Sequence, residues 1–424
     1  MRFVVRILIV LVLVFLVGWF GGRAYLARSV ASHEGTISGA GVKAPVEITF
    51  DAKGVPQVWA KTDADAYFAI GWLHASERLF QMELVRRLSR GELSEVFGEA
   101  AYETDVHQRR IGFARRAHAA ALTPSAREAS QRYIDGVNAF LAQTKQLPPE
   151  FVLLRLKPRP WTIEDCLAIS GYQTWFSHEL MDQDQKYQKL IDKLGMPATA
   201  LTNAGHPWSP PTVSGSGAQG AESGSVDLSC LNPLRPAPCA LRPEAGEYSI
   251  TTASNSWAVA PSRSASGAAL HASDPHLSID QAPGLWYLAG LHSEEGLNVV
   301  GVTYAGAPFV VMGHNETIAY SFTVASVDLI DYFDDAPVST LREEIRVKGE
   351  QVPRVLEVKS GSRGVMIDDN TSLHWAGFDF EPATITDSAV RLQKAGTFDE
   401  FRSAVTGFGA LDANWIYSDR AGSR

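Results

Sequence analysis

The sequence lacks several features that would mark common classes of protein. Its formal net charge is −9 and it has no run rich in lysine and arginine, so nothing would neutralise a phosphate backbone, and we expect no nucleic-acid partner. Neither a Gly-x-Ser-x-Gly nor a His-Glu-x-x-His motif occurs, which disfavours an α/β-hydrolase and a zincin. The 424 residues are 45% hydrophobic and can bury a large core, so small-molecule chemistry is the better expectation.

Cysteine is also scarce, with three residues in the whole chain. Cys230 and Cys239 lie close together in a stretch rich in glycine, serine and proline, and export of the protein would allow them to pair. Their spacing is not that of zinc ligands. Cys166 lies in a helical pattern, which predicts a small buried hydrophobic residue.

The N-terminus combines a basic start with an apolar run. Arg2 and Arg6 precede the uncharged segment 7–20, and Arg23 follows it, a pattern typical of an export signal or a membrane anchor. The apolar run is short for a membrane-spanning helix of roughly 20 residues, which argues against an anchor. The only small-x-small site at which a signal peptide could be cleaved, 29–31, lies far downstream of the run, which argues against a cleaved signal. Both alternatives stay open. We expect a periplasmic or extracellular body, either free or anchored to the inner membrane through residues 7–22.

The first half of the body reads as mainly helical. Two strand-like runs, 45–50 and 55–60, flank a turn and predict a hairpin. Apolar residues at helical spacing predict a helix that Asp63 caps and Gly91 ends. Further helices are expected from Ser125 and after Thr162, which forms a weak capping box with Asp165.

The second half reads as strands separated by turns. After the Gly/Ser/Pro-rich block 203–246, which can be a spacer or an ordinary linker, short β-branched and aromatic runs begin. We predict an α+β fold. The expected strands are 257–260, 267–272, 285–292, 297–304 and 318–323, with a strand pair across Gly349 within 345–358 and one helix at 398–405.

One tetrapeptide at the boundary between these halves carries a family resemblance. Ser254-Asn255-Ser256-Trp257 resembles the start of the catalytic chain in the penicillin acylase family of N-terminal-nucleophile hydrolases. The segment 51–91 is similar to the α-chain of the same family. The resemblance implies a four-layer αββα sandwich. It also implies four regions: a signal or anchor at 1–31, an α-chain region at 36–202, a spacer at 203–253 and part of the catalytic β-chain at 254–424.

The resemblance also implies how Ser254 would act, because no partner base is visible in the motifs. An N-terminal serine carries its own base, an α-amine whose unperturbed pKa is roughly 7.7–8.0. That amine exists only after the preceding peptide bond is cut. We therefore predict self-cleavage between Ala253 and Ser254, giving α- and β-chains that stay together as a heterodimer.

Three further positions match the family's catalytic residues. His276, in Asp274-Pro275-His276, matches a residue placed near the nucleophile, and we expect it to position the substrate and the serine amine. A surface or core histidine is the alternative. The backbone N–H of Val324 and the side chain of Asn414 match the two oxyanion donors.

A metal site is implied as well. Asp328 and Asp331, with the Ile330 carbonyl between them, suit a hard cation such as calcium, and the resemblance adds Glu179 as a helical ligand. A solvated charged strand end is the alternative reading. No organic cofactor is expected.

The substrate is expected to be a small N-acyl compound, such as a β-lactam antibiotic or an acyl-homoserine lactone. Family members carry a histidine or a glutamine at the position of His276, and the histidine disfavours a phenylacetyl substrate. Candidate acyl-pocket residues are Trp175, Leu277, Met312 and Ser326, although a helical tryptophan is more often core.

The end of the sequence weighs against a complete enzyme. Residues 419–422 read as a hairpin turn that needs a returning strand, so we expect a truncated member of the family. The competing hypothesis is a noncatalytic, membrane-anchored remnant or binding protein.

Overall fold

A computed structural model describes residues 2–38, 41–181, 193, 253–277, 284–325, 327, 329–409 and 411–422. The chain divides into two compact units, one made of residues 1–178 and 252–424 and the other of 179–251. Almost all described residues belong to the first unit. The predicted spacer and the pair Cys230 and Cys239 lie outside the described residues, whereas Cys166 is buried with a free thiol, as predicted.

The apolar N-terminus forms α1, Arg2–Ala27, whose side chains are almost all exposed. Its segment Phe3–Ala27 is long and apolar enough to cross a membrane. The helix thus extends beyond the uncharged run at both ends, through Arg6 and Arg23, and the shortness of that run does not argue against an anchor. A signal sequence would pass the same test of length and composition.

Helices dominate the chain before residue 182, as predicted. They are α2 Asp63–Arg90, α3 Ser94–Phe97, η1 Gly98–Ala101, α4 Tyr102–Ile111, α5 Phe113–Ala119, α6 Pro124–Gln143, α7 Pro149–Leu153 and α8 Ile163–Met181. Gly91 ends α2 in the left-handed conformation, with φ of 63°. The predicted cap was wrong by one residue: the Thr62 side chain accepts the Asp65 N–H, because Asp63 already has helical geometry.

Two glycines allow α2 and α6 to pack at backbone contact. A Cβ on Gly71 would lie 2.0 Å from the Tyr133 carbonyl oxygen, and one on Gly136 would lie 2.0 Å from the Phe68 carbonyl oxygen. Both distances are far below any real carbon–oxygen contact. The crossing therefore requires glycine on both helices.

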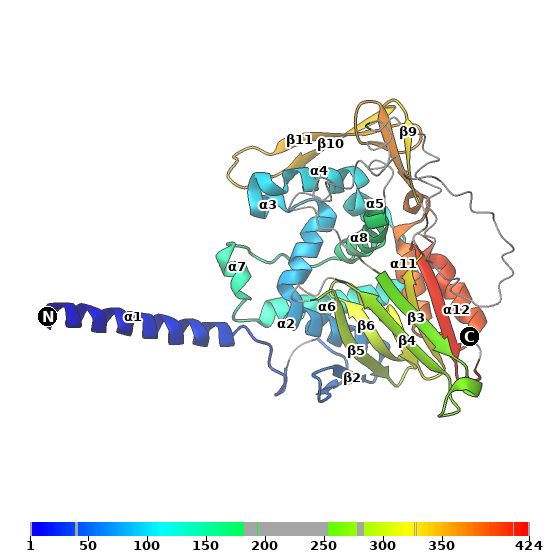
Figure 1. Cartoon of the computed structure of the whole chain (residues 1–424), viewed down its shortest axis with the longest axis horizontal. Coiled ribbons are helices and arrows are strands. Elements are labelled where there is room, and N and C mark those ends of the chain that lie inside the picture. Colours follow the sequence, from blue (N-terminus) through cyan, green and yellow to red (C-terminus); the bar gives the residue numbers. More distant parts are fainter. Residues whose placement is uncertain are drawn as a thin grey trace, which may run out of the picture. The chain divides into compact units, whose positions relative to one another are not determined.

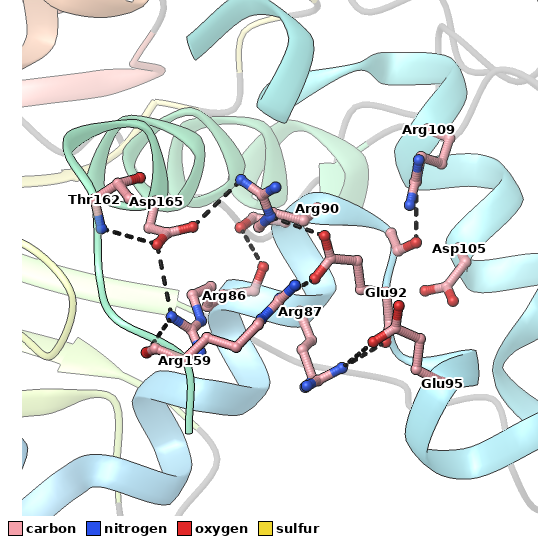
Figure 2. A network of polar contacts seen from close by, with 12 residues as sticks. Arg86, Arg87, Arg90, Glu92, Glu95, Asp105, Arg109, Arg159, Thr162 and Asp165 are labelled. Carbon is pink, nitrogen blue, oxygen red and sulfur yellow. Dashed lines mark hydrogen bonds and ion pairs between the residues drawn. The ribbon is translucent and has the colours of Figure 1, made fainter. Parts of the chain in front are cut away.

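A charged network joins the end of α2 to the segments around it (Figure 2). Glu83 is buried between two arginines of its own helix, Arg86 and Arg87. Arg86 and Arg90 also reach the Asp165 carboxylate at the start of α8, at 3.6 and 3.3 Å. Buried charges are tolerated only when paired, so this network ties the helical region together rather than forming a binding site.

The described strands form two sheets and one separate hairpin (Figure 1). The main sheet has the order β1-β2-β5-β6-β7-β8-β14 and the small sheet the order β10-β11-β12-β13-β9. The main-sheet strands are β1 Glu47–Phe50, β2 Pro56–Ala60, β5 Trp286–Ser293, β6 Asn298–Tyr304, β7 Met312–Asn315, β8 Ile318–Val324 and β14 Ala413–Asp419. The small-sheet strands are β9 Ile330–Asp334, β10 Ser339–Ile345, β11 Arg354–Ser360, β12 Val365–Met366 and β13 Thr371–Trp375. All neighbours are antiparallel except β2 and β5, which are parallel.

The remaining elements complete the second half. The hairpin consists of β3 Ala253–Val259 and β4 Leu270–His276, and the helices are α11 Pro382–Leu392 and α12 Phe398–Val405. Short 3₁₀ turns lie at η3 Pro261–Arg263, η4 Ala376–Asp379 and η5 Thr406–Phe408. The main core contains residues of α2, α6, α11 and the main sheet.

The predicted mixture of helix and strand is confirmed, with shifts in detail. The first hairpin and the helix at 398–405 are where the sequence places them. The strand pair across Gly349 lies further out, since β10 ends at Ile345 and β11 begins at Arg354. The strands predicted at 257–260 and 267–272 are shifted, to Ala253–Val259 and Leu270–His276. The sequence patterns did not predict the following elements: β7, β9, β12, β13, β14, α3, α4, α5, α7 and α11.

Candidate active site

Ser254 is the second residue of β3, and its side chain is half-buried. In the antiparallel pairing with β4, Ser254 lies opposite Pro275 and Ala253 lies opposite His276. The predicted cleavage site and the predicted histidine are therefore neighbours across one ladder. His276 is the last residue of β4, and it shares the strand face of Ala253 and Asn255, opposite to the face that carries the Ser254 side chain.

The His276 ring has two polar neighbours. Its Nε2 atom lies 3.0 Å from the Asp274 carboxylate and 3.3 Å from the Asn255 side-chain nitrogen. A carboxylate partner orients an imidazole. The sequence reading did not assign a role to Asp274, although it stands two residues before His276, on the same face of the strand.

Val324 and Asn414, 90 residues apart in the sequence, come together on adjacent strands. Val324 ends β8 opposite Ala413, and Asn414 lies opposite Thr323. The Asn414 amide is 3.5 Å from the Thr323 hydroxyl, a long contact. Successive N–H groups of a strand point to opposite edges. Because the Ala325 N–H reaches the Asp412 carbonyl at 3.3 Å, the Val324 N–H is directed away from β14.

The hairpin packs on β8 and β14, and hydrogen bonds between side chains show how it is aligned. Residues two apart on a strand share a face, as do residues opposite each other in a ladder. The hydroxyls of Ser256 and Ser321 are 2.5 Å apart. The face of β3 that carries Ser254 and Ser256 therefore meets the face of β8 that carries Ser321 and Thr323.

A second contact fixes the direction of this alignment. His271, opposite Ala258 in the hairpin, lies 2.9 Å from the hydroxyl of Ser418 on β14, and Ser418 lies opposite Ala319. Ala258, two residues after Ser256 on β3, therefore lies toward the start of β8. Ser254, two residues before Ser256, lies toward the end of β8, where Thr323 and Asn414 are opposite each other. The fold therefore directs the predicted nucleophile toward the predicted oxyanion donors.

A cavity of about 590 Å³ lies between the hairpin and the main sheet. Its lining includes His271, Met312, Ser321 and Ser418, and burial lowers the pKa of His271 below its ordinary value. Of the predicted acyl-pocket residues, Met312 lines this cavity. Leu277 directly follows β4, and Ser326 lies outside the described residues.

Trp175 occupies a different place. It is fully buried in a second core cluster, with its ring centroid 5.3 Å from that of Trp375 and 6.4 Å from that of Phe113. The lining of the cavity near Met312 does not include it. Its predicted contact with an acyl group stays a prediction, while its role in the core is observed.

The predicted calcium ligands are only partly described. Ile330 is buried and Asp331 exposed at the start of β9, where they pair with Trp375 and His374 of β13. Asp328 and the side chain of Glu179 lie outside the described residues. Within the described part of the chain, no group of three or more His, Cys, Asp or Glu side chains could hold a metal.

The fold is mixed α+β, and Ser254 lies near the start of a hairpin strand that packs on β8 and β14. The penicillin amidase family model matches residues 45–423, and the chain belongs to this family.

Curated relatives support the assignment over a similar range. The chain is 30% identical to penicillin acylase 2 proenzyme of Pseudomonas sp. (strain SE83) over 446 aligned residues, covering 95% of this chain and 54% of that protein. It is 26% identical to acyl-homoserine lactone acylase QuiP of Pseudomonas fluorescens (strain Pf0-1), covering 89% of this chain and 49% of that protein. The chain thus spans about half the length of these relatives.

Solved structures match a smaller part. A thermostable penicillin G acylase from Alcaligenes faecalis, in its tetragonal form, matches with 26% identity and a TM-score of 0.34, covering 40% of this chain and 97% of that chain.

Proposed function

We propose that this chain belongs to an exported amidohydrolase, which cleaves the amide bond of a small N-acyl compound through Ser254 as an N-terminal nucleophile. The observation that carries this proposal is the alignment of the hairpin on the main sheet, which directs Ser254 toward Val324 and Asn414. Membership of the penicillin amidase family supports it.

The nucleophile would first have to be released by self-cleavage. The Ser254 hydroxyl attacks the Ala253 carbonyl carbon, its proton passes to the departing nitrogen, and the C–N bond breaks as an ester forms. Water then hydrolyses the ester, which leaves a carboxylate on Ala253 and a free amine and hydroxyl on Ser254. The small side chain of Ala253 leaves room for this attack. The relative from Pseudomonas sp. (strain SE83) is a proenzyme by name, which is consistent with a precursor.

Hydrolysis of the substrate would follow the same chemistry. The free amine of Ser254 takes the proton from its own hydroxyl as that oxygen attacks the substrate amide. The Val324 N–H and the Asn414 amide donate hydrogen bonds to the oxyanion, and loss of one such donor costs about 2.7–4 kcal/mol of transition-state stabilisation. His276, oriented by Asp274, would position the amine and the substrate from the backbone side of Ser254, since its ring lies on the strand face opposite to the Ser254 side chain.

Two substrate classes follow from the names of the relatives. One relative is a penicillin acylase and another acts on acyl-homoserine lactones, so we propose a β-lactam or an N-acyl-homoserine lactone. The cavity beside Met312 has a volume within the range of small-molecule sites, about 300–1,000 Å³. We propose that Met312, which lines this cavity, contacts the acyl group, and we propose Leu277 and Ser326 as further acyl contacts on the family resemblance.

We further propose that the complete enzyme is a four-layer αββα sandwich whose α- and β-chains stay associated after cleavage. Calcium, held by Glu179, Asp328, Ile330 and Asp331, would be structural and take no part in the chemistry. The apolar helix α1 would deliver the protein to the periplasm or the exterior as a cleaved signal or an inner-membrane anchor. Metal analysis of the purified chain tests the calcium proposal, which a protein without bound calcium would contradict.

The central experiment compares the unmodified chain with Ser254→Ala by intact-mass spectrometry. We expect the unmodified chain to yield a fragment that begins at Ser254, and the variant to stay uncut. Ser262→Ala, which removes an exposed hydroxyl from the turn after β3, is the matched control and should be cut normally.

Hydrolysis is then measured on N-acyl substrates with acyl chains of graded length. A folded, uncut chain without hydrolysis would support the alternative of a noncatalytic remnant or binding protein. Full activity of an uncut chain would contradict the role of the freed amine.

A further inference from the structure

Four polar side chains meet between the hairpin and the main sheet, and the catalytic proposal gives none of them a part in the reaction itself. We call Ser256, His271, Ser321 and Ser418 the inter-sheet network. Ser321 and Ser418 are only 2% and 4% exposed. Burying a hydroxyl lowers the stability of the fold unless the hydroxyl is hydrogen-bonded. We therefore ask which hydrogen bonds each of the four side chains makes.

The contacts fit one continuous direction of hydrogen-bond donation. The Ser256 hydroxyl donates to the Ala272 carbonyl at 3.2 Å, so it accepts from Ser321 at 2.5 Å. The Ser321 oxygen then accepts from His271 Nε2 at 2.6 Å, and His271 Nδ1 accepts from the Ser418 hydroxyl at 2.9 Å. The neutral histidine with its proton on Nε2 satisfies every member.

This chain of bonds runs from β14 through β4 and β8 to β3, so it fastens both strands of the hairpin to both strands beneath them. The hairpin has only two strands and would be marginal alone. Apolar packing fixes little about how one layer slides over another, because contact between alkyl groups has no direction. Hydrogen bonds are lost when the atoms move by about 1 Å. The network therefore selects one alignment of β3 on β8.

We propose that the inter-sheet network positions the nucleophile: Ser256 and His271 hold β3 in the alignment that brings Ser254 to Val324 and Asn414. Ser256 lies two residues from Ser254 on the same strand face, so a shift at Ser256 is passed directly to the nucleophile. This inference rests on the function proposed above. It assigns positioning residues to that site and no new reaction.

The same contacts show that Ser321 is not a second nucleophile with His271 as its base. A base must have a free lone pair toward the hydroxyl that it activates. Here the His271 atom nearest Ser321 is a donor, and the Ser321 proton is directed to Ser256. The pair therefore has the bonding pattern of a structural connection.

The test measures the rate of cleavage between Ala253 and Ser254 by intact-mass spectrometry of the freshly synthesised full chain. We expect Ser256→Ala to slow cleavage about 10- to 100-fold, since a displacement of about 1 Å at a reacting group costs that much. Ser256→Thr keeps the hydroxyl and should restore most of the rate. Ser262→Ala is the control for removing a serine hydroxyl from the same part of the chain.

Hydrogen exchange of the amides in 253–259 and 270–276 is measured in parallel, so that misfolding is separated from displacement. We expect faster exchange in these two strands of Ser256→Ala and unchanged exchange in α2 and α6. Ser256→Ala and His271→Leu should also be non-additive, because each breaks the same chain of bonds. Slower cleavage with this local pattern supports the inference.

The outcomes separate the two proposals. Wild-type cleavage rates in both Ser256→Ala and His271→Leu would overturn the positioning role, while the proposed role of Ser254 as N-terminal nucleophile would stand. Slow cleavage in Ser256→Ala that Ser256→Thr fails to restore would have the same meaning. Absence of cleavage in the unmodified, folded chain would overturn the proposed function and this inference together.

Discussion

His74 provides a sharp test of the packing between the helical region and the main sheet. It is fully buried on α2, and its ring contacts two hydroxyls at 2.9 Å, Tyr133 at Nδ1 and Thr303 at Nε2. The Gly306 N–H donates to the Tyr133 oxygen, and the Thr303 hydroxyl donates to the Tyr287 carbonyl. Thr303, whose proton goes to Tyr287, therefore accepts from His74 Nε2–H, and the neutral ring then accepts the Tyr133 proton at Nδ1.

The pH dependence follows from this arrangement. Burial, together with the nearby positive charge of Arg78, lowers the pKa of His74 from 6.5 to about 3. A histidine whose folded-state pKa is depressed takes up its proton more readily in the unfolded state. Its contribution to stability is therefore present above pH 6.5 and is lost progressively as the pH falls from 6.5 toward 3. At about 1.36 kcal/mol per pH unit, the loss is about 2.7 kcal/mol by pH 4.5.

His74→Gln is the informative variant, because its amide can accept from Tyr133 and donate to Thr303 without ever taking a proton. Urea unfolding, followed by tryptophan fluorescence, is measured between pH 7.5 and pH 4.5. We expect the variant to be less stable than the wild type at pH 7.5. The difference should shrink by about 2.7 kcal/mol at pH 4.5, where the wild type alone carries the protonation cost.

The control is His118→Gln, which removes an exposed imidazole from α5 and should leave the stability profile parallel to that of the wild type. Parallel profiles for His74→Gln and the wild type across this pH range would refute the reasoning. They would show that His74 is not held neutral between the two hydroxyls.

Three further predictions test other parts of the fold by urea unfolding. Gly136→Ala should lower the free energy of unfolding by about 1–3 kcal/mol or more, because the added methyl group meets the Phe68 carbonyl; unchanged stability would contradict the close helix crossing. Glu83→Gln should cost up to about 3–5 kcal/mol because it removes the buried charge shared by Arg86 and Arg87, which keep only Asp165 and Glu95, whereas exposed Glu103→Gln should change little. Trp175→Ala should cost about 3–5 kcal/mol and Trp175→Phe clearly less; equal stability of all three proteins would remove Trp175 from the core.

Local patterns in the sequence predicted much of the secondary structure. The end of α2 at Gly91 follows from the glycine, and its start was predicted to within one residue from a capping side chain, since such effects extend over a few residues. The hairpin of β1 and β2 follows from two short runs around a turn. Missed strands such as β7 and β12 are short, with four and two residues, and carry little periodicity of their own. They are strands because neighbouring strands supply their hydrogen bonds.

The sequence by itself determined which residues are candidates for the proposed chemistry: a serine after a small residue, a histidine near it and an asparagine that matches the family's oxyanion donor. Tertiary structure alone decided where they lie. Val324 and Asn414 lie on adjacent strands because β8 and β14 pair across 90 residues of sequence, and the hairpin that carries Ser254 is aligned on the main sheet by the contacts of Ser256 and His271. Such alignments depend on hydrogen bonds between strands distant in sequence, and a local pattern of residues does not contain them.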